Sequence, residues 1–298
     1  MTVRQPVLAI RDLSLSFRGA GGDSEVLHSI SLHVNAGEKV ALVGESGSGK
    51  SVTARLAMGL LQGTRGARAS GSIRFAGTEI IAGGQEIARL RGTRVTMIFQ
   101  DPTSALNPTF TIRTQFRQVL RSSNPRLSSR EADLMAEAGL ADVQIDNPRR
   151  VLDSYAFQLS GGMNQRVMIA MALISRPRLL IADEPGTALD VTVQAQTLKL
   201  MHDLTERLGT AVLLISHNLG VVREFADRIY VIYRGSMVEH GLTSQLFRAP
   251  HHPYTRALLS AVPRITGAEL PGIVERSDEF LRPLYVHAGC GEPGGAGS

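Results

Sequence analysis

The N-terminal part of the chain shows the alternation of hydrophobic and polar side chains that is typical of β-strands. Residues 7–17 (VLAIRDLSLSF) and 29–34 (SISLHV) alternate in this way, and a loop containing Gly-Gly-Asp separates them. Residues 71–80 (GSIRFAGTEI) have the pattern of a further hairpin arm. Two shorter hydrophobic runs, residues 39–44 (KVALVG) and 95–101 (VTMIFQD), are expected to form buried strands.

The remainder of the chain is dominated by helical spacing. Residues from about 102 to 159 have a helical, more polar pattern, and residues 130–140 (READLMAEAGL) are its clearest amphipathic segment. Predicted helices then follow over residues 163–174, 192–209 and 219–226. They alternate with predicted strands over residues 179–183, 211–217, 228–235 and 236–241. Strands that alternate with helices predict a parallel sheet covered by helices, and the polar helical block is predicted to be an insertion into that sheet.

Residues 44–51 (GESGSGKS) match the phosphate-binding pattern Gly-x4-Gly-Lys-Ser. The motif directly follows a predicted strand and opens a predicted helix, which is the context that phosphate binding requires. Glycines let the backbone curl so that successive N–H groups face one anion. We expect Lys50 to reach the β- and γ-phosphates of a nucleotide and Ser51 to coordinate Mg²⁺. The alternative is a glycine-rich turn that contains a lysine by chance.

Three predicted buried strands end in polar side chains that could meet at one edge of the sheet. Asp183 and Glu184 follow the run Leu-Leu-Ile-Ala, Gln100 ends residues 95–100, and His217 ends the run Ala-Val-Leu-Leu-Ile-Ser. We expect Asp183 to support Mg²⁺ and Glu184 to act as general base on the attacking water. Gln100 could complete the Mg²⁺ coordination and orient that water, and His217 could hydrogen-bond the γ-phosphate. Alternatively, Gln100 and His217 are ordinary strand ends with satisfied polar groups.

A second anion site is predicted at Ser160, Gly161 and Gly162. Hydrophobic residues recur at helical spacing from Met163 to Ile174, so Ser160 is a natural N-cap of the helix. A helix start preceded by two glycines exposes backbone N–H groups at the positive end of the helix dipole. An ordinary capped core helix is the alternative.

Composition narrows the possible classes of protein. The 298 residues are 43% hydrophobic, which excludes a disordered protein. The formal net charge is +5, but Lys and Arg are scattered, so the charge is only weak support for a nucleic-acid partner. The longest apolar run, residues 167–174, is far shorter than the ~20 residues that span a bilayer. Cys290 is the one cysteine, so no internal disulfide forms and a cytosolic location fits.

The order of the motifs resembles that of the ATP-binding subunit of ABC transporters, over about residues 7–262. The motifs that carry the resemblance are GESGSGKS, FQDPTSALNP, LSGGMNQR, LLIADEPGTALD and ISH, in this order. The resemblance implies an α/β fold, with a P-loop NTPase core of the RecA type, an N-terminal antiparallel β subdomain and an inserted α-helical subdomain. It implies a nucleotide-binding domain over residues 1–240, with the helical insertion at about 101–165, and a C-terminal extension over 241–298.

The resemblance also implies a role for each matched residue. The phosphate loop comprises Gly44, Ser46, Gly47, Gly49, Lys50, Ser51 and Val52. In this family the Leu-Ser-Gly-Gly signature binds the γ-phosphate of ATP held by the other subunit of a head-to-tail dimer. Ser160, Gly161 and Gly162 would therefore complete a composite site with the partner's phosphate loop.

The remaining matched positions are distributed along the chain. Asp183 matches the residue that supports the metal, Glu184 the catalytic glutamate, Gln100 the glutamine that couples Mg²⁺ to the membrane partner, and His217 the switch histidine. Phe17 matches the aromatic residue that stacks on adenine, although it could equally be a core residue. Ala188, Leu189 and Asp190 match the loop that crosses the dimer interface.

A further resemblance narrows the group to importers of oligopeptides, dipeptides and nickel. Residues 249–264 (APHHPYTRALLSAVPR) are similar to the His-Pro-Tyr-Thr segment of those subunits. His251 and His252 could instead be a metal-binding pair, but adjacent histidines point in different directions on most backbones. Many peptide-importer subunits carry an iron–sulfur cluster, which requires several thiolates. Because Cys290 is the one cysteine, we expect no iron–sulfur cluster.

Several positions depart from the family pattern. Gly186 stands where Thr or Ser is usual, and glycine there loosens the backbone beside the catalytic residue. Asn164 replaces a usual Arg in the signature helix and removes a charge near the subunit interface. Phe157 and Ala156 replace a frequent His and Pro in a segment that faces the membrane subunit in the family. Ser216 replaces the commoner Thr, which is a mild change.

The sequence thus predicts an ATPase subunit that drives import of peptides, with nickel, another metal chelate or a small solute as the alternative. ATP and Mg²⁺ are the implied substrate and cofactor. The implied partners are a second ABC subunit, more often a paralogue than an identical copy, two permeases and an extracytoplasmic solute-binding protein. The implied location is peripheral, at the cytoplasmic face of the plasma membrane. A non-transport ABC ATPase acting on DNA or the ribosome, and a regulatory subunit with a degenerate site, remain as alternatives.

Overall fold

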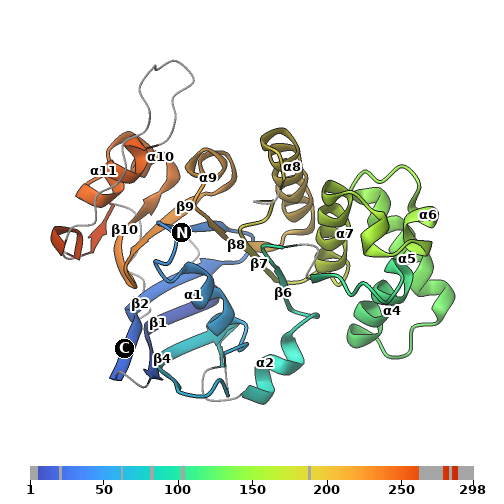
Figure 1. Cartoon of the computed structure of the whole chain (residues 1–298), viewed down its shortest axis with the longest axis horizontal. Coiled ribbons are helices and arrows are strands. Elements are labelled where there is room, and N and C mark those ends of the chain that lie inside the picture. The colour runs from blue at the N-terminus through green and yellow to red at the C-terminus, as the bar shows by residue number, and fades with distance from the viewer. Residues whose placement is uncertain are drawn as a thin grey trace. The chain divides into compact units, whose positions relative to one another are not determined.

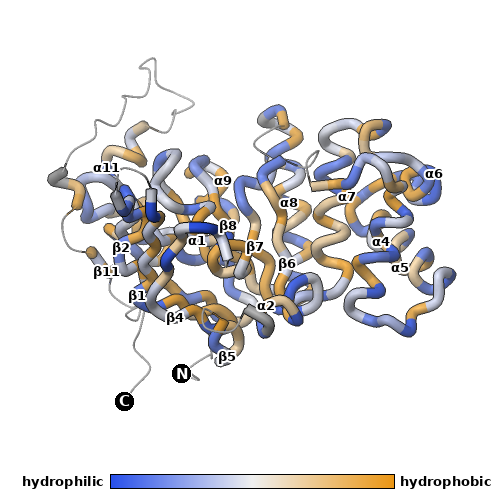
Figure 2. The backbone as a smooth tube through the Cα atoms, turned by 60° about the horizontal axis from the view of Figure 1, so that its bottom comes forward, coloured by the Kyte–Doolittle hydropathy of each residue, from blue (hydrophilic) through white to orange (hydrophobic). Residues whose placement is uncertain are grey.

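Two stretches of the chain that are far apart in sequence build the first of two units. The computed structural model describes residues 6–19, 22–61, 63–80, 84–101, 105–186, 189–261, 278–281 and 284–287. The first unit consists of Met1–Ala88 and Leu213–Ser298, and the second of Arg89–Val212 (Figure 1). Buried hydrophobic residues lie in the strands of both units and, in the second unit, also along the helices (Figure 2). The domain boundaries inferred from sequence, 1–240 with an insertion at about 101–165, stay predictions.

The first unit contains the predicted antiparallel sheet. Its strands are β1 (Pro6–Gly19), β2 (Gly22–Asn35), β4 (Ala67–Phe75) and β5 (Thr78–Glu79), in the order β2-β1-β4-β5. β2 begins earlier than predicted, because Asp23 pairs with Arg18 in the ladder and is not a loop residue. The first residues of β2, 22–25, are exposed and lack hydrophobic side chains, so they show no hydrophobic alternation to detect.

A second, mixed sheet in this unit carries the phosphate loop. Its strands follow the order β11-β10-β9-β3-β8, where they are β11 (Tyr285–Val286), β10 (Ser236–Leu242), β9 (Arg228–Tyr233), β3 (Lys39–Val43) and β8 (Ala211–Ser216). β3 and β9 are parallel, as the sequence predicts, whereas β10 is antiparallel to β9. Every residue of β3, β8 and β9 is buried, which explains their continuous hydrophobic runs.

Short helices connect these strands, and the sequence predicts two of them, α1 and α9. They are α1 (Lys50–Ala57), α9 (Leu219–Phe225), α10 (Thr243–Arg248), α11 (Pro253–Ser260) and the 3-10 helix η2 (Asp278–Leu281). α2 (Gly84–Leu90) contains the boundary between the two units. The glycine-rich C-terminal end, which the sequence predicts to be disordered, lies outside the described residues.

The second unit combines two parallel strands with a group of helices. The strands β6 (Val95–Ile98) and β7 (Leu179–Asp183) pair in parallel. The helices are α4 (Ile112–Ser123), α5 (Ser129–Asp142), α6 (Pro148–Asp153), η1 (Ala156–Gln158), α7 (Gly161–Leu173) and α8 (Val191–Leu208). Asp133 on α5 accepts two hydrogen bonds of 2.7 Å from Arg117 on α4, and these lower the pKa of Asp133. Among the described residues, no helix is long and apolar enough to span a membrane.

A buried polar cluster joins β9 and β10 to β2 in the first unit. The Arg228 guanidinium donates to both carboxylate oxygens of Glu38, at 2.8 and 2.9 Å, and to Oη of Tyr230 at 2.7 Å. The ring of His240 stacks on Tyr230, with centroids 5.0 Å apart. Burial, followed by the positive charge of Arg228, lowers the pKa values of His33 and His240 to about 4. Both histidines are therefore neutral in the folded protein near pH 7.

Replacing His240 with phenylalanine (His240→Phe) is expected to make the protein less sensitive to acid. A folded pKa of about 4 lies below the unfolded value of 6.5, so the unfolded chain binds more protons between these values. The contribution of neutral His240 to the free energy of unfolding is therefore fully present above pH 6.5 and is lost as the pH falls towards 4. Between pH 7 and 5 the variant should lose about 2–4 °C less in melting temperature than the wild type. If the melting temperatures of the variant and the wild type fall by the same amount between pH 7 and 5, the prediction is wrong. The control is His202→Phe, which replaces a half-exposed histidine.

Candidate functional site

The phosphate loop starts where β3 leaves the sheet, and its glycines are required by close packing. A Cβ atom at Gly44 would lie 2.2 Å from the carbonyl oxygen of Ile232. A Cβ atom at Gly49 would lie 2.6 Å from Cδ2 of Leu27, and Gly49 has a left-handed φ of +106°. Any larger residue at either position would push the loop away from β9 or β2.

Lys50 is buried and folds back onto the loop that precedes it. Its Nζ donates hydrogen bonds to the carbonyl oxygens of Gly44, at 2.9 Å, and Glu45, at 2.8 Å. Gly49 is the N-cap of α1, and no side chain caps this helix. Ser51 and Val52 lie half-buried in its first turn. An N-terminus without a side-chain cap, together with a lysine on the same loop, is the arrangement that binds phosphate in P-loop proteins.

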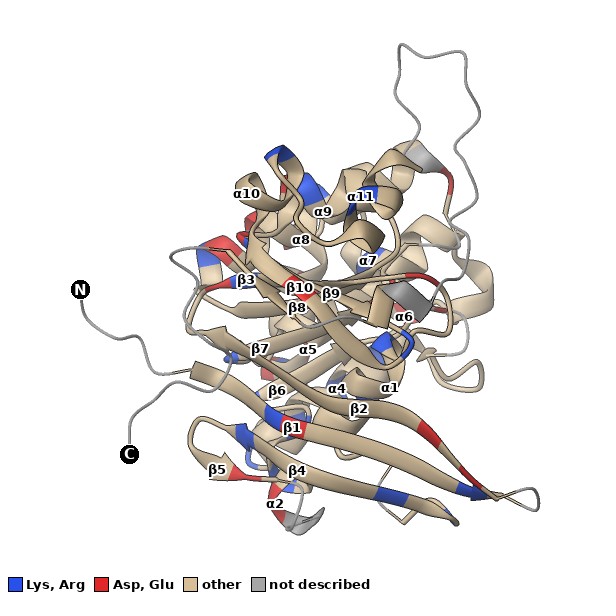
Figure 3. Ribbon diagram, turned by 90° about the vertical axis from the view of Figure 1, so that its left-hand side faces the viewer, with Lys and Arg blue, Asp and Glu red and all other residues tan. Residues whose placement is uncertain are grey.

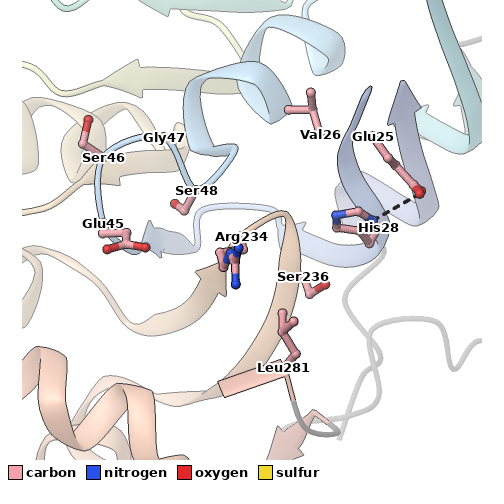
Figure 4. A pocket seen from close by; sticks show the side chains of 10 residues that line it. All are labelled: Glu25, Val26, His28, Glu45, Ser46, Gly47, Ser48, Arg234, Ser236 and Leu281. Carbon is pink, nitrogen blue, oxygen red and sulfur yellow. Dashed lines mark ion pairs between the residues drawn. The ribbon is translucent and has the colours of Figure 1, made fainter. Parts of the chain in front are cut away.

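A pocket of about 920 Å³ lies against this loop (Figure 4). Ser46 and Gly47 are exposed and line it, together with Glu45, Ser48 and Arg234 from the turn between β9 and β10. The pocket has the size of many small-molecule sites, and one of its walls is the loop backbone.

Phe17 and His217 also belong to the first unit. Phe17 lies in β1, where it is half-buried and pairs with Ser24 of β2 and Ala67 of β4. It does not line the pocket beside the phosphate loop, so its predicted contact with adenine stays a prediction. His217 is exposed and directly follows β8, the neighbour of β3 in the sheet.

The second unit brings together Gln100, Asp183 and Glu184 at the ends of β6 and β7. Asp183 is the last residue of β7 and is 3% exposed. Nε2 of Gln100 donates a 3.2 Å hydrogen bond to Oε2 of Glu184. Glu184 has a left-handed φ of +48°, which is unfavourable for a residue other than glycine. This backbone places the side chains of Asp183 and Glu184 on a sharp turn at the edge of the sheet.

The signature turn caps α7 as the sequence predicts. Ser160 is the N-cap, and its Oγ accepts a 3.3 Å hydrogen bond from the N–H of Met163. Ser160 and Gly161 are exposed, and Gly162 is partly exposed. A Cβ atom at Gly161 would be 3.4 Å from Leu189, so glycine is not needed there for packing. The small residues keep the backbone N–H groups of the first turn accessible to an anion.

Asn164, which departs from the family pattern, has a structural role. It is 3% exposed, and its Nδ2 donates a 3.0 Å hydrogen bond to the carbonyl oxygen of Ala156. Asn164 thus ties α7 to η1, the short helix that carries the exposed Phe157. The stacked ring of Tyr155, 5.5 Å from that of Phe157, holds this exposed side chain in place.

The two adjacent histidines of the C-terminal region take different roles. His252 is fully buried and caps α11, where its Nδ1 accepts a 3.1 Å hydrogen bond from the N–H of Tyr254. His251 is exposed and lies near Glu239 and His287 instead. Cys290 lies outside the described residues.

Sequence reasoning missed two residues that contact the loop or its supports. Tyr254 is buried, and its Oη accepts a 2.9 Å hydrogen bond from the N–H of Glu45. Glu239 is fully buried on β10 and binds the backbone at His251 and His252. The signal that could have identified Tyr254 is its motif, His-Pro-Tyr-Thr, but the motif does not indicate which distant backbone group the side chain contacts.

Comparisons with known proteins identify the family. The ABC transporter family model matches residues 27–187, and the model of the oligopeptide/dipeptide transporter C-terminal region matches residues 238–291. A probable D,D-dipeptide transport ATP-binding protein of Escherichia coli, DdpD, is 48% identical over 276 residues, covering 91% of this chain and 84% of the relative. The oligopeptide transport ATP-binding protein OppD of Bacillus subtilis is 43% identical over 281 residues, covering 93% and 78%.

Solved structures agree with this result. A dimeric structure of the ATP-binding cassette MJ0796, in a post-hydrolysis state with ADP and Pi, is 25% identical, with a TM-score of 0.70. The match covers 79% of this chain and 98% of that one. The predicted α/β fold of the P-loop type, with its antiparallel β part, is confirmed. The chain, with its phosphate loop and its peptide-transporter C-terminal region, belongs to the ABC transporter family, as one of its ATP-hydrolysing, ATP-binding subunits.

Proposed function

We propose that this chain hydrolyses ATP to drive the uptake of peptides through a membrane transporter. One observation carries the proposal: the same chain contains the ATPase residues and a C-terminal region that matches oligopeptide/dipeptide transporters over residues 238–291. Relatives named for transport of D,D-dipeptides and oligopeptides support peptides as the solute. Nickel, another metal chelate or another small solute is the alternative, because the ATPase subunit does not itself contact the solute.

In this proposal the phosphate loop and Lys50 bind the β- and γ-phosphates of ATP. The hydrogen bonds from Nζ of Lys50 to the carbonyl oxygens of Gly44 and Glu45 hold its ammonium group at this loop, from which it would reach the phosphates. Ser51, Gln100 and Asp183 each offer an oxygen atom, the ligand type that Mg²⁺ prefers. When bound, Mg²⁺ would neutralise charge on the transferring phosphate.

Glu184 is proposed as the general base. It would accept a proton from the attacking water as the oxygen of that water bonds to the γ-phosphorus, while the bond to ADP breaks. The 3.2 Å hydrogen bond from Gln100 orients the Glu184 carboxylate in the absence of nucleotide. His217 is proposed to donate a hydrogen bond to the γ-phosphate, and Phe17 to stack on adenine.

The proposed working unit is a head-to-tail dimer. The exposed turn at Ser160, Gly161 and Gly162 would grip the γ-phosphate held by the partner subunit's phosphate loop. The dimeric structure of MJ0796 supports a dimer, and we propose a paralogous subunit as the partner. Two permeases and a solute-binding protein would complete the transporter, with this chain peripheral at the cytoplasmic face of the membrane.

Nucleic acid is not part of the proposal. Lys and Arg of the described residues are spread over many elements and are interleaved with Asp and Glu (Figure 3). A nucleic-acid site would instead require a clustered basic surface.

The variant Glu184→Gln is expected to lose ATP turnover and to keep ATP binding. Loss of a general base lowers turnover by about 10²–10⁴-fold, whereas the amide keeps the size and hydrogen-bonding capacity of the side chain. Phosphate release and the affinity for a fluorescent ATP analogue are the two measurements. Glu137→Gln, the same change at an ion pair with exposed Arg149, should leave both unchanged. Normal turnover in Glu184→Gln would show that another residue is the base.

The peptide assignment predicts ATP-dependent accumulation of a labelled dipeptide in vesicles that contain the complete transporter. Uptake should fall by at least about 10²-fold when this subunit carries Glu184→Gln, because each transport cycle needs hydrolysis to reset it. A labelled nickel–histidine complex, tested in the same vesicles, is the comparison. Accumulation of nickel and not of dipeptide would overturn the peptide assignment and leave the ATPase assignment intact.

A further inference from the structure

The His-Pro-Tyr-Thr segment reaches the phosphate loop through a single buried side chain. Tyr254 is fully buried, and its Oη accepts a 2.9 Å hydrogen bond from the N–H of Glu45. That N–H belongs to the peptide group that links Gly44 to Glu45. The carbonyl oxygen of the same peptide group accepts the 2.9 Å hydrogen bond from Nζ of Lys50. Tyr254 and Lys50 therefore hold one peptide group of the loop from its two sides.

Aromatic packing fixes the position of the Tyr254 ring. Its centroid lies 4.5 Å from that of Tyr233 and 5.6 Å from that of Phe280, and the latter two are 5.5 Å apart. Tyr233 is the last residue of β9, and the turn that follows it donates a 2.9 Å hydrogen bond from the N–H of Gly235 to the carbonyl oxygen of Ser48. Figure 4 shows this turn, with Arg234, beside the loop. The three rings thus support the loop at Glu45 and, through the turn, at Ser48.

A buried carboxylate anchors the segment that carries Tyr254. Oε1 of Glu239 accepts hydrogen bonds of 2.7 Å from the N–H of His251 and from Nε2 of His287, and Oε2 accepts one of 3.1 Å from the N–H of His252. Burial alone would raise the pKa of Glu239, but the hydrogen bonds that it accepts outweigh burial and lower that pKa. His252 in turn accepts from the N–H of Tyr254, so the anchor continues to the tyrosine.

Glu239, His251, His252 and His287 form a hydrogen-bonded cluster, which we call the clasp. Glu239, His251 and His287 have the composition of a metal site, with their candidate ligand atoms within 4.8 Å of one another. However, the rings of His251 and His287 are stacked, 4.2 Å apart and inclined by 16°, so their in-plane lone pairs do not converge on one point. Nε2 of His287 already donates to Glu239. We therefore assign the cluster the role of anchoring the segment that carries Tyr254, and not that of binding a metal.

We propose that Tyr254 is a positioning residue of the ATPase, which orients the Gly44–Glu45 peptide group and thereby Lys50, so that nucleotide affinity depends on the docked C-terminal segment. Without the tyrosine hydroxyl, the N–H of Glu45 loses its partner in a partly buried place and the peptide group is free to rotate. Lys50 would then be less often in the position from which it reaches phosphate. The inference rests on the proposed role of Lys50 in binding nucleotide, and not on the identity of the solute.

The variant Tyr254→Phe tests this role, because it keeps the ring and removes one oxygen atom. We expect the dissociation constant for ATP, and the KM for hydrolysis, to rise about tenfold, which corresponds to loss of one buried hydrogen bond. The kcat at saturating ATP should stay within about twofold, because Tyr254 does not touch the reacting atoms. Both quantities would be measured in the full chain.

Tyr230→Phe is the matched control, since it also removes the hydroxyl of a fully buried tyrosine. That hydroxyl bonds to Arg228 and the N–H of His33 and not to the phosphate loop. Tyr230→Phe is expected to lower the melting temperature without changing the dissociation constant for ATP. If Tyr254→Phe behaves in the same way, Tyr254 is only a structural residue and the proposal is overturned. Failure of the wild type to bind ATP would instead refute the proposed function itself.

Amide hydrogen exchange of the wild-type protein provides a test that does not depend on the folding of a variant. In the absence of nucleotide, the N–H of Glu45 should exchange at least about tenfold more slowly than that of the exposed Gly47 in the same loop. Equal exchange at Glu45 and Gly47 would mean that the Tyr254 hydrogen bond does not hold the loop, and the proposal would fail.

Discussion

The peptide group between Gly44 and Glu45 is the point on which the nucleotide site of the first unit depends. On one side, Gly44 lies so close to the end of β9 that a Cβ atom would be 2.2 Å from the Ile232 oxygen. On the other, Lys50 and Tyr254 bind its carbonyl oxygen and N–H. The loop is therefore shaped before phosphate arrives. Preorganisation of this kind reduces the entropy that binding must overcome, because the anion finds N–H groups already directed at one place.

Backbone strain is present in the second unit where the chemistry is proposed. Glu184 has a left-handed φ of +48°, and Gly186, two residues later, has a φ of +95°. The N–H of Leu189 donates a 2.9 Å hydrogen bond to the carbonyl oxygen of Gly186. Glycine at this position is therefore suited to the conformation, where the Thr or Ser usual in the family would be strained. Gly186 shapes the turn after Glu184, which refines the interpretation that it merely loosens the backbone.

The sequence was sufficient for features that depend on local patterns and insufficient for those that depend on distant contacts. The loop at residues 44–51, the strand ending at Asp183 and the helix capped by Ser160 each carry their signal within a few neighbouring residues. The hydrogen bond between Glu45 and Tyr254 joins residues 209 positions apart, and no periodicity records it. The same holds for Glu239, whose charge on a strand resembles a solvated side chain until its donors at His251, His252 and His287 are known. Asn164 looked like a lost surface charge for the same reason, because its burial under η1 is a tertiary property.

The location of Tyr254 has a consequence for what distinguishes this group of ABC subunits. The residues of the clasp and Tyr254 itself all lie within residues 238–291, the part matched by the peptide-transporter C-terminal model. The phosphate loop motif, by contrast, is a general feature of nucleotide-binding proteins. The phosphate loop, which many nucleotide-binding proteins share, is thus supported by a C-terminal region that is specific to this group. β11 belongs to that region and pairs in parallel with β10. Because the support acts on the peptide group that holds Lys50, the C-terminal region can tune nucleotide affinity without contributing any atom to the phosphate site. Differences in affinity between subunits with the same loop sequence would then arise from how this region packs.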